Sequence, residues 1–152
     1  MKLWFAAVVA AFVLVFGITP GTAQAGDGFA HHVVFHVDDN DKAKMNIALN
    51  NAANVIKYYE GKSQKVQVEI VAYGPGLHML RDDTSPVKQR IEMFAMDYDT
   101  VGFAACGNTI TGMTKKEGAA PPLIKSDNVK VVPSGVVQLM TRQDQGWHYI
   151  RP

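Results

Sequence analysis

The chain has a single cysteine, Cys106, at the end of a short apolar run that begins at Val101 and gives way to Gly-Asn-Thr109. This pattern is typical of a buried parallel strand that turns into a helix at its carboxyl end. In open α/β sheets, ligands and reacting groups collect at such strand ends. The N–H groups and positive pole of a starting helix favour a thiolate. The sequence therefore predicts a reactive, solvent-accessible sulfur, with a buried structural cysteine as the alternative.

The absence of a second cysteine limits what Cys106 does. No disulfide within one chain is possible, so the thiol is free, buried or paired with another molecule. Because no second thiol stands ready to resolve a mixed disulfide, a thioredoxin-like oxidoreductase is disfavoured.

The first 25 residues have the features of a secretory signal peptide. Lys2 is followed by an apolar stretch over residues 3–18, and Ala23-Gln24-Ala25 has the small residues that a signal peptidase recognises. We expect cleavage before Gly26, a domain over residues 26–152, and export, with the bacterial periplasm as the expected compartment. An uncleaved membrane anchor is the alternative, but the apolar stretch is shorter than the about 20 residues that span a bilayer.

The charge balance excludes two classes of partner. The chain has 15 Lys and Arg against 14 Asp and Glu, and Lys2 would leave with the signal peptide. A neutral domain without a basic cluster is not expected to bind nucleic acid, whose affinity depends on neutralised phosphates. For the same reason we expect no binding to an anionic membrane after signal cleavage.

Alternating strand and helix patterns predict the fold class. We expect strands at 32–37, 66–72, 101–105, 129–133 and 147–150, and helices at 42–60, 85–95, 108–115 and 135–142, with a helical turn at 76–80. In the first helix, the apolar residues recur at helical spacing from Met45 to Tyr59. The pattern predicts one α/β domain, a three-layer α/β/α arrangement with a mostly parallel five-stranded sheet.

Parallel strands place their following loops at one edge of the sheet, so these loops are the predicted pocket rim around Cys106. Gly107 is expected to clear space beside the sulfur, and Asn108 and Thr109 to offer hydrogen-bond donors. His78 is a further candidate, as a base for the thiol. The loops after the first and fourth strands add Asp38, Asp39 and 133–135 to the rim. The predicted pocket residues are Tyr73, Gly74, Gly76, Gly107, Asn108, Thr109 and Ser134.

Two other binding patterns are weak. Residues 102–109 imitate a phosphate-binding loop, but Asn108 stands where that loop needs lysine, and Gly102 falls inside the predicted strand. His32 and His36 are expected to face one side of the first strand and His31 the other, without a thiol or carboxylate to complete a metal site. We therefore predict no cofactor and no metal.

Four segments carry a resemblance to a known family. They are Tyr73-Gly-Pro-Gly-Leu77, Phe103-Ala-Ala-Cys-Gly-Asn-Thr109, Val131-Val-Pro-Ser-Gly135 and Gly146-Trp-His-Tyr-Ile-Arg-Pro152. In their order and spacing the chain resembles the exported branch of the DsrE/DsrF-like sulfur-relay family. The resemblance implies a three-layer α/β/α domain that assembles into trimers or hexamers. It also implies that Cys106 carries a persulfide between a sulfur donor and an acceptor protein.

Two hypotheses follow. The first is an exported, homo-oligomeric sulfur carrier that holds sulfane sulfur on Cys106, without independent enzymatic turnover. The second is a non-catalytic binding or scaffold module with a structural cysteine. Whether the chain is an enzyme stays open at this point.

Overall fold

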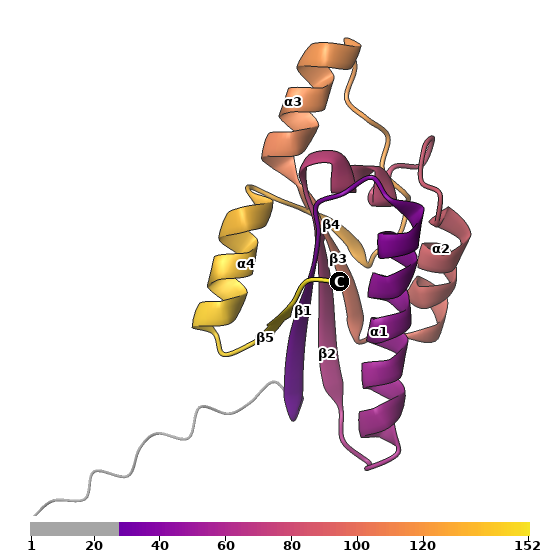
Figure 1. Cartoon of the computed structure of the whole chain (residues 1–152), viewed down its shortest axis with the longest axis vertical. Helices are drawn as coiled ribbons and strands as arrows, with labels where there is room; N and C mark the ends of the chain where they lie inside the picture. The colour runs from indigo at the N-terminus through magenta and orange to yellow at the C-terminus, as the bar shows by residue number, and fades with distance from the viewer. Residues whose placement is uncertain (1–27) are drawn as a thin grey trace, which may run out of the picture.

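The computed structural model describes residues 28–152, so the predicted signal peptide lies outside the described residues. The described part folds around one five-stranded sheet with the strand order β4-β3-β2-β1-β5 (Figure 1). Every neighbouring pair of strands is parallel. The prediction of an α/β domain is confirmed, and the sheet is wholly parallel. Within residues 28–152 no helix is both long and apolar enough to cross a membrane.

The elements alternate along the chain as the sequence pattern predicts. The strands are β1 (His31–Val37), β2 (Val66–Ala72), β3 (Val101–Cys106), β4 (Val129–Val132) and β5 (His148–Ile150). The helices are α1 (Lys42–Glu60), the 3₁₀ helix η1 (Gly74–Leu80), α2 (Lys88–Asp97), α3 (Gly107–Glu117) and α4 (Gly135–Asp144).

The element boundaries differ from the predicted ones mainly in two places. The second α-helix begins at Lys88, because Val87 adopts a non-helical conformation and becomes its N-cap. The third strand includes Cys106 itself, so the thiol belongs to the strand end as well as to the start of α3. The remaining differences are one to three residues at each end, apart from the longer 3₁₀ helix, and change no element.

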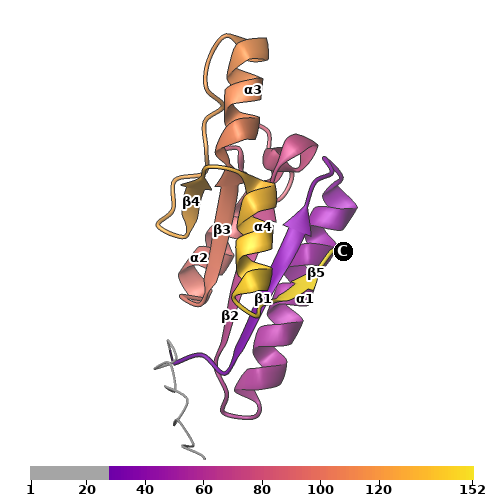
Figure 2. The same cartoon turned by 90° about the vertical axis from the view of Figure 1, so that its left-hand side faces the viewer.

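The two faces of the sheet are covered unequally. Helices α1 and α2 cover one face and α4 the other (Figures 1 and 2). The main core lies on the α1 and α2 side, where Phe35, Ile70 and Phe103 are fully buried under residues such as Met45 and Leu49. The α4 side has a smaller apolar cluster, made of Val34, Val71, Ala104, Leu139 and Trp147. The larger core therefore supplies most of the apolar burial that stabilises the fold.

Helix α3 extends beyond the end of the sheet instead of covering a face (Figures 1 and 2). No residue of α3 is fully buried. Near its free end, Glu117 accepts hydrogen bonds from the buried Arg81 at 2.7 and 2.9 Å, and Arg81 also binds Asp83. Met113 of α3 packs partly against the main core. This helix is thus held at a few points, one of them at each end.

Candidate functional site at the carboxyl edge of the sheet

The strand register brings the predicted rim together. Val37, Ala72 and Ala105 are consecutive partners across β1, β2 and β3, and Cys106 pairs with Val132 of β4. The loops that follow these strands therefore all begin at the same edge, as the parallel arrangement predicts. Because side chains alternate along a strand, Cys106 lies on the same face as Ala104, which is the α4 side.

Cys106 is more buried than the sequence analysis expected. Its exposed fraction is 4%, so the expectation of a sulfur open to solvent is wrong for the single chain. The thiol is deep because it is the last residue of a central strand, where α3 and α4 both begin beside it. Its surroundings, however, include polar groups that favour its ionised form.

Hydrogen-bond donors from two helix starts face the sulfur. Burial raises the pKa of the Cys106 thiol, but the hydroxyl of Thr109 and the backbone N–H groups of Gly135, Thr109 and Asn108 lower it. The net pKa lies below the usual value for cysteine. Thr109 and Asn108 belong to the first turn of α3, and Gly135 begins α4. The positive ends of both helices thus favour a thiolate.

The orientation of Thr109 explains how its hydroxyl serves the sulfur. The backbone N–H of Gly74 donates to Thr109 Oγ1 at 2.8 Å. Because that oxygen already accepts a hydrogen bond, its own proton is free to point at Cys106 Sγ. Gly74 has a φ of +53°, a left-handed conformation that glycine adopts without strain. Gly74 and Thr109 are therefore both predicted pocket residues with an identified contact.

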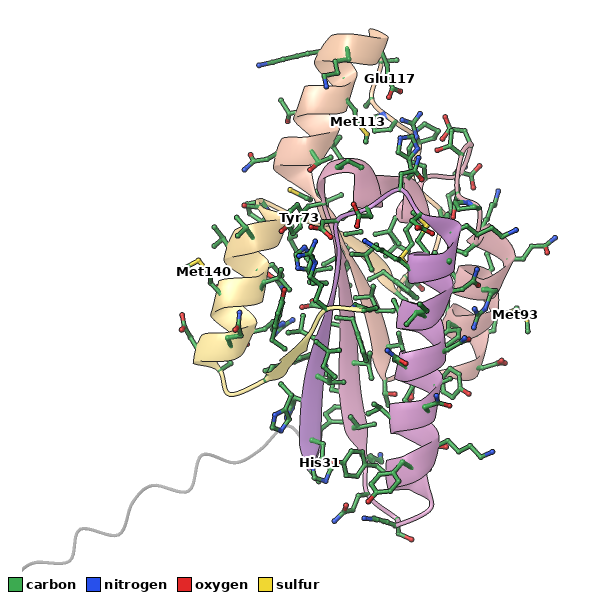
Figure 3. All side chains as sticks on the ribbon, viewed as in Figure 1. His31, Tyr73, Met93, Met113, Glu117 and Met140 are labelled. Carbon is green, nitrogen blue, oxygen red and sulfur yellow. The ribbon has the colours of Figure 1, made fainter. Side chains whose placement is uncertain are left out.

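Tyr73 forms a wall of the site by packing on Gly135. A Cβ atom placed on Gly135 would lie 2.8 Å from Tyr73 Cβ and 2.9 Å from its Cδ1, so only glycine allows this approach. Tyr73 lies near the start of α4 and the base of α3 (Figure 3). Gly135 was expected only as a rim residue, and its role as an N–H donor to the sulfur was missed because sequence gives no distance between two helix starts.

Three other predicted pocket residues have structural explanations. Gly107 lies against the end of β4, where a Cβ would meet Val132 O at 3.1 Å and Pro133 O at 3.3 Å, and its expected role of clearing space beside the sulfur stays a prediction. Gly76 lies against the backbone at the end of β1. Ser134 precedes α4 as its N-cap, without a capping bond from its side chain. Glycine at the first two positions lets neighbouring backbones approach closely.

A polar network lies next to Tyr73 on the same side of the sheet. The His36 ring stacks on Tyr73 with the ring centroids 4.7 Å apart and the planes 19° apart. His36 Nδ1 is 2.7 Å from the hydroxyl of Tyr149, which lies on β5. His36 Nε2 is 3.6 Å from Asp38 Oδ2, and Asp38 accepts a hydrogen bond from Arg151 at 2.8 Å. Residues of four strand ends thus form one continuous row from Tyr149 to Cys106.

A groove of about 450 Å³ shares Thr109 with the sulfur site. It runs between η1 and α3, and Gly74 also lines it. His78 lies in this groove, where its Nδ1 is 2.8 Å from Thr84 Oγ1. The structure gives His78 a hydrogen-bond partner, and its role as a base for Cys106 stays a prediction. Other predicted residues, namely Tyr73, Gly76, Gly107, Asn108 and Ser134, do not line this groove.

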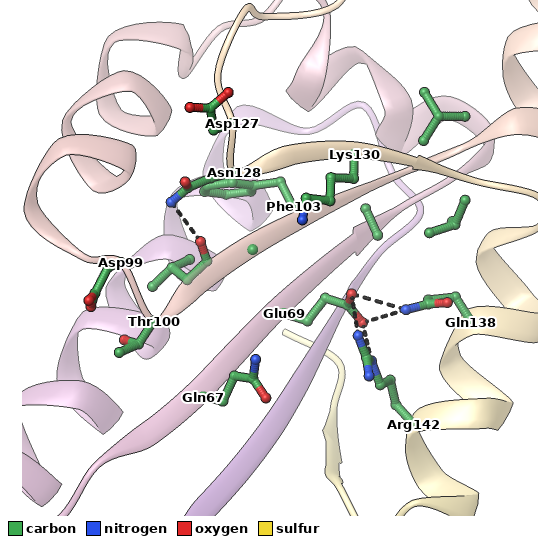
Figure 4. Close-up of a pocket in the computed structure, with 15 residues that line it drawn as sticks. Gln67, Glu69, Asp99, Thr100, Phe103, Asp127, Asn128, Lys130, Gln138 and Arg142 are labelled. Carbon is green, nitrogen blue, oxygen red and sulfur yellow. Dashed lines mark hydrogen bonds and ion pairs between the residues drawn. The ribbon is translucent and has the colours of Figure 1, made fainter. Parts of the chain in front are cut away.

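A second hollow, of about 370 Å³, lies over β3 and β4 on the α4 side (Figure 4). Its lining includes Gly102 and Lys130 but not Cys106. The carboxylate of Glu69 accepts hydrogen bonds from Gln138 and Arg142 at its wall, at 2.7 to 3.0 Å. These polar groups are therefore already paired within the domain.

The histidines of β1 face opposite sides, as expected. His31 stacks on Tyr59 of α1, whereas His32 lies 5.0 Å from the ring of Trp147 and His36 from β1 also faces that side. Within residues 28–152, no group of three side chains is arranged to hold a metal ion. Gly102 lies within β3, as predicted, which is the wrong place for a phosphate-binding loop.

Together, a parallel α/β domain and a lone thiol between two helix starts define the class of protein. The chain belongs to the DsrE/DsrF-like family, whose model matches residues 31–152. It is similar in structure to a protein of unknown function, MTH1491, from Methanobacterium thermoautotrophicum. The two are 33% identical, the alignment covers 80% of this chain and 99% of that one, and the TM-score is 0.66. No curated protein matches the chain.

Proposed function

We propose that this protein is an exported carrier of sulfane sulfur, which it holds as a persulfide on Cys106. The observation that carries the proposal is the set of donors around the sulfur, which lower the pKa of Cys106 in spite of its burial. A buried thiol with a purely structural role needs no such donors, because its neutral form is stable in apolar surroundings. Membership of a family linked to sulfur relay adds support.

The loading step follows from the chemistry of a thiolate. The Cys106 thiolate attacks the outer sulfur of a donor persulfide, and a new S–S bond forms between Sγ and that sulfur. The bond between the outer sulfur and the donor breaks, and the donor leaves as a thiolate. With thiosulfate as the donor, the leaving group is sulfite. The step needs no external oxidant or reductant, because the electron pair of the broken bond leaves with the donor.

Unloading requires a second molecule, because the chain has no other cysteine. A thiolate of an acceptor attacks the outer sulfur of the Cys106 persulfide, and Cys106 leaves as a thiolate. Until then, the Thr109 hydroxyl and the N–H groups of α3 and α4 stabilise the persulfide anion, as they do the thiolate. The protein is accordingly a carrier with partners on both sides, and we do not assign it a turnover of its own.

Mass spectrometry of the intact protein tests the proposal. After incubation with polysulfide or thiosulfate, we expect a gain of one sulfur mass that dithiothreitol removes. The Cys106→Ser variant should show no gain. If native protein gains no sulfur, while the unfolded chain is alkylated normally at Cys106, the carrier proposal is wrong.

The rival proposal, a scaffold with a structural cysteine, is favoured by one observation. Cys106 is 96% buried in the single chain, so a donor must find an opening to the sulfur. For this alternative we expect native protein to resist both sulfuration and alkylation at neutral pH, and Cys106→Ala to leave its association state unchanged.

We also propose that the protein is a homo-oligomer, a trimer or hexamer. Four apolar side chains at the outer surface of α4 and the edge strand β4 are more than half exposed in the single chain: Val131, Val136, Val137 and Met140 (Figure 3 labels Met140). A second copy of the chain fits these exposed apolar side chains, because contact between copies removes them from water. Light scattering should show an oligomer that Met140→Lys weakens. Met96→Lys, on α2, is the matched control, since Met96 is 78% exposed on the other side of the sheet. A monomeric native protein would contradict the proposal.

Export completes the proposed function. If residues 1–25 are a signal peptide, the mature protein isolated from the periplasm should begin at Gly26. Intact mass and amino-terminal sequencing decide this. A protein that keeps residues 1–25 would contradict it.

A further inference from the structure

We infer that His36 and Tyr149 are positioning residues for Cys106, which they serve by fixing the ring of Tyr73 against the start of α4. The inference rests on the proposed function only in that the thiolate of Cys106 is the working form. It assigns a role to β5, which is the edge strand opposite β4 and is not hydrogen-bonded to β3.

The first step is the contact between Tyr73 and Gly135. Side-chain atoms of Tyr73 lie within 3 Å of the position that a Cβ would take on Gly135, so the aromatic side chain rests on the backbone of α4 at its first residue. The N–H of that same residue is one of the donors to Cys106 Sγ. Because a hydrogen bond weakens steeply with distance and angle, a shift of Tyr73 would change the donation from Gly135.

The second step is what fixes Tyr73. Its ring stacks on His36 with the planes only 19° apart, so the position of one ring determines that of the other. The hydroxyl of Tyr149 is 2.7 Å from His36 Nδ1, which prevents the imidazole from rotating about its Cβ–Cγ bond. Tyr149 is paired in turn, through β5, with β1, on which His36 itself lies. The orientation is therefore transmitted from β5 through His36 to Tyr73.

The third step is that packing alone does not explain a histidine here. His36 is 7% exposed and follows two residues after Val34, which belongs to the apolar cluster on the α4 side. Burying an imidazole costs free energy that an apolar side chain of similar size would avoid. Moreover, His36 Nε2 has no hydrogen-bond partner among the described residues. The hydrogen bond at Nδ1 fixes the plane of the imidazole ring, and the fixed plane keeps the stacked ring of Tyr73 in place.

The charged groups around His36 do not hold its ring in place. Asp38 and Asp39 follow β1, Lys44 comes from α1, and Arg151 follows β5. Arg151 pairs with Asp38, and Lys44 with Asp39, so their charges are largely compensated within these pairs. Burial is the largest influence on His36 and lowers its pKa, so the ring is neutral at pH 7 and accepts or donates at Nδ1 as a neutral imidazole.

The test measures the rate of Cys106 alkylation by iodoacetamide across pH, in native protein. The midpoint of the profile reports the thiol pKa, whereas the plateau at high pH reports access to the sulfur. For His36→Ala, which leaves the Tyr73 ring over the sulfur site, we expect the midpoint to rise by about one unit, which means about tenfold less thiolate at pH values below it. Tyr149→Phe keeps the ring and removes only the hydroxyl, so we expect a smaller rise in the same direction.

A double variant distinguishes action through Tyr73 from direct action. If His36 acts through Tyr73, adding His36→Ala to Tyr73→Ala should produce no further shift of the midpoint. His148→Gln, on the same strand as Tyr149 but facing the other side of the sheet, and Tyr58→Phe, on the exposed surface of α1, are matched controls that should leave the profile unchanged.

The outcomes separate the inference from the proposed function. If Cys106 of the native protein is unreactive at every pH, the carrier proposal fails. If Cys106 reacts normally but Tyr149→Phe and His36→Ala leave the midpoint where it was, the inference fails alone. Thermal unfolding accompanies each variant, and Tyr149→Phe decides the matter if His36→Ala does not fold, because Tyr149 is 41% exposed and tolerates the loss of a hydroxyl.

Discussion

Replacement of Gly76 by alanine should destabilise the protein strongly, because the backbone of β1 occupies the space that a side chain would need. A Cβ on Gly76 would lie 2.2 Å from Val37 O, 2.6 Å from Val37 C and 2.8 Å from Asp38 N. An ordinary contact begins near 3.4 Å, so the two backbones would have to separate by more than 1 Å. That separation would break the hydrogen bond from the Tyr73 N–H to Val37 O, which measures 3.2 Å.

The magnitude follows from what must move. Overpacking a well-packed interior costs about 1 to 3 kcal/mol, and the upper end applies here because the obstacle is backbone in a central strand instead of a flexible side chain. We therefore expect Gly76→Ala to lower the free energy of unfolding by about 3 kcal/mol. Urea denaturation followed by circular dichroism measures this free energy.

Gly112→Ala is the matched control. It lies within α3, has no atom within 4 Å of an added Cβ, and does not have a positive φ. Alanine is about 0.5 to 1 kcal/mol better than glycine in a helix interior, so this change should stabilise slightly. If the two variants have equal free energies of unfolding, the close approach of η1 to β1 is wrong, and with it the account of how Gly74 reaches Thr109.

Two further predictions concern His36, beside the site, and Glu117, at the end of α3. Burial lowers the pKa of His36 below its usual 6.5, so an NMR titration should give a midpoint below that value. The free energy of unfolding should fall as the pH drops below 6.5, because the unfolded chain then binds more protons than the folded one. In His36→Gln this part of the pH dependence should disappear, and an unchanged dependence would contradict the assignment. Glu117→Gln should increase hydrogen exchange in the last turn of α3, because it weakens the ion pair with Arg81. Lys130→Gln, which changes an exposed charge on β4, is its control. Equal hydrogen exchange in α3 of both variants would contradict the conclusion that Arg81 holds the end of this helix.

Most of the fold could be predicted because each element carries a local signal. The helix α1 follows from apolar residues at helical spacing. Residues 38–41 offer several possible N-caps, and in the structure Asp41 is the one used, its carboxylate accepting from Ala43 N at 2.7 Å. The start of α2 was predicted too early, because Pro86 suits the first turn of a helix but Val87 adopts a non-helical φ and ψ in this chain. Helix propensities do not predict the φ and ψ of an individual residue such as Val87.

The candidate site was only partly predictable, for a reason of geometry. Alternation and parallel order place Cys106, Tyr73 and Thr109 at one edge of the sheet, and the structure agrees. The burial of the sulfur depends on how closely α3 and α4 approach each other, which no sequence pattern gives. Likewise, His36 and Tyr149 are 113 residues apart in the chain, and only the pairing of β1 with β5 brings them together.

The unequal faces of the sheet explain how this fold accommodates polar groups beside a buried thiol. On the α1 side, fully buried residues such as Phe35, Leu49 and Ile91 form a continuous core. On the α4 side, the apolar cluster is small, and at the carboxyl edge it gives way to the row of Tyr149, His36, Tyr73 and Cys106. Buried polar groups destabilise a domain unless they are hydrogen-bonded, so such a row is tolerated only where other packing compensates. The larger core supplies that compensation, and the smaller face can therefore hold polar side chains beside the thiol.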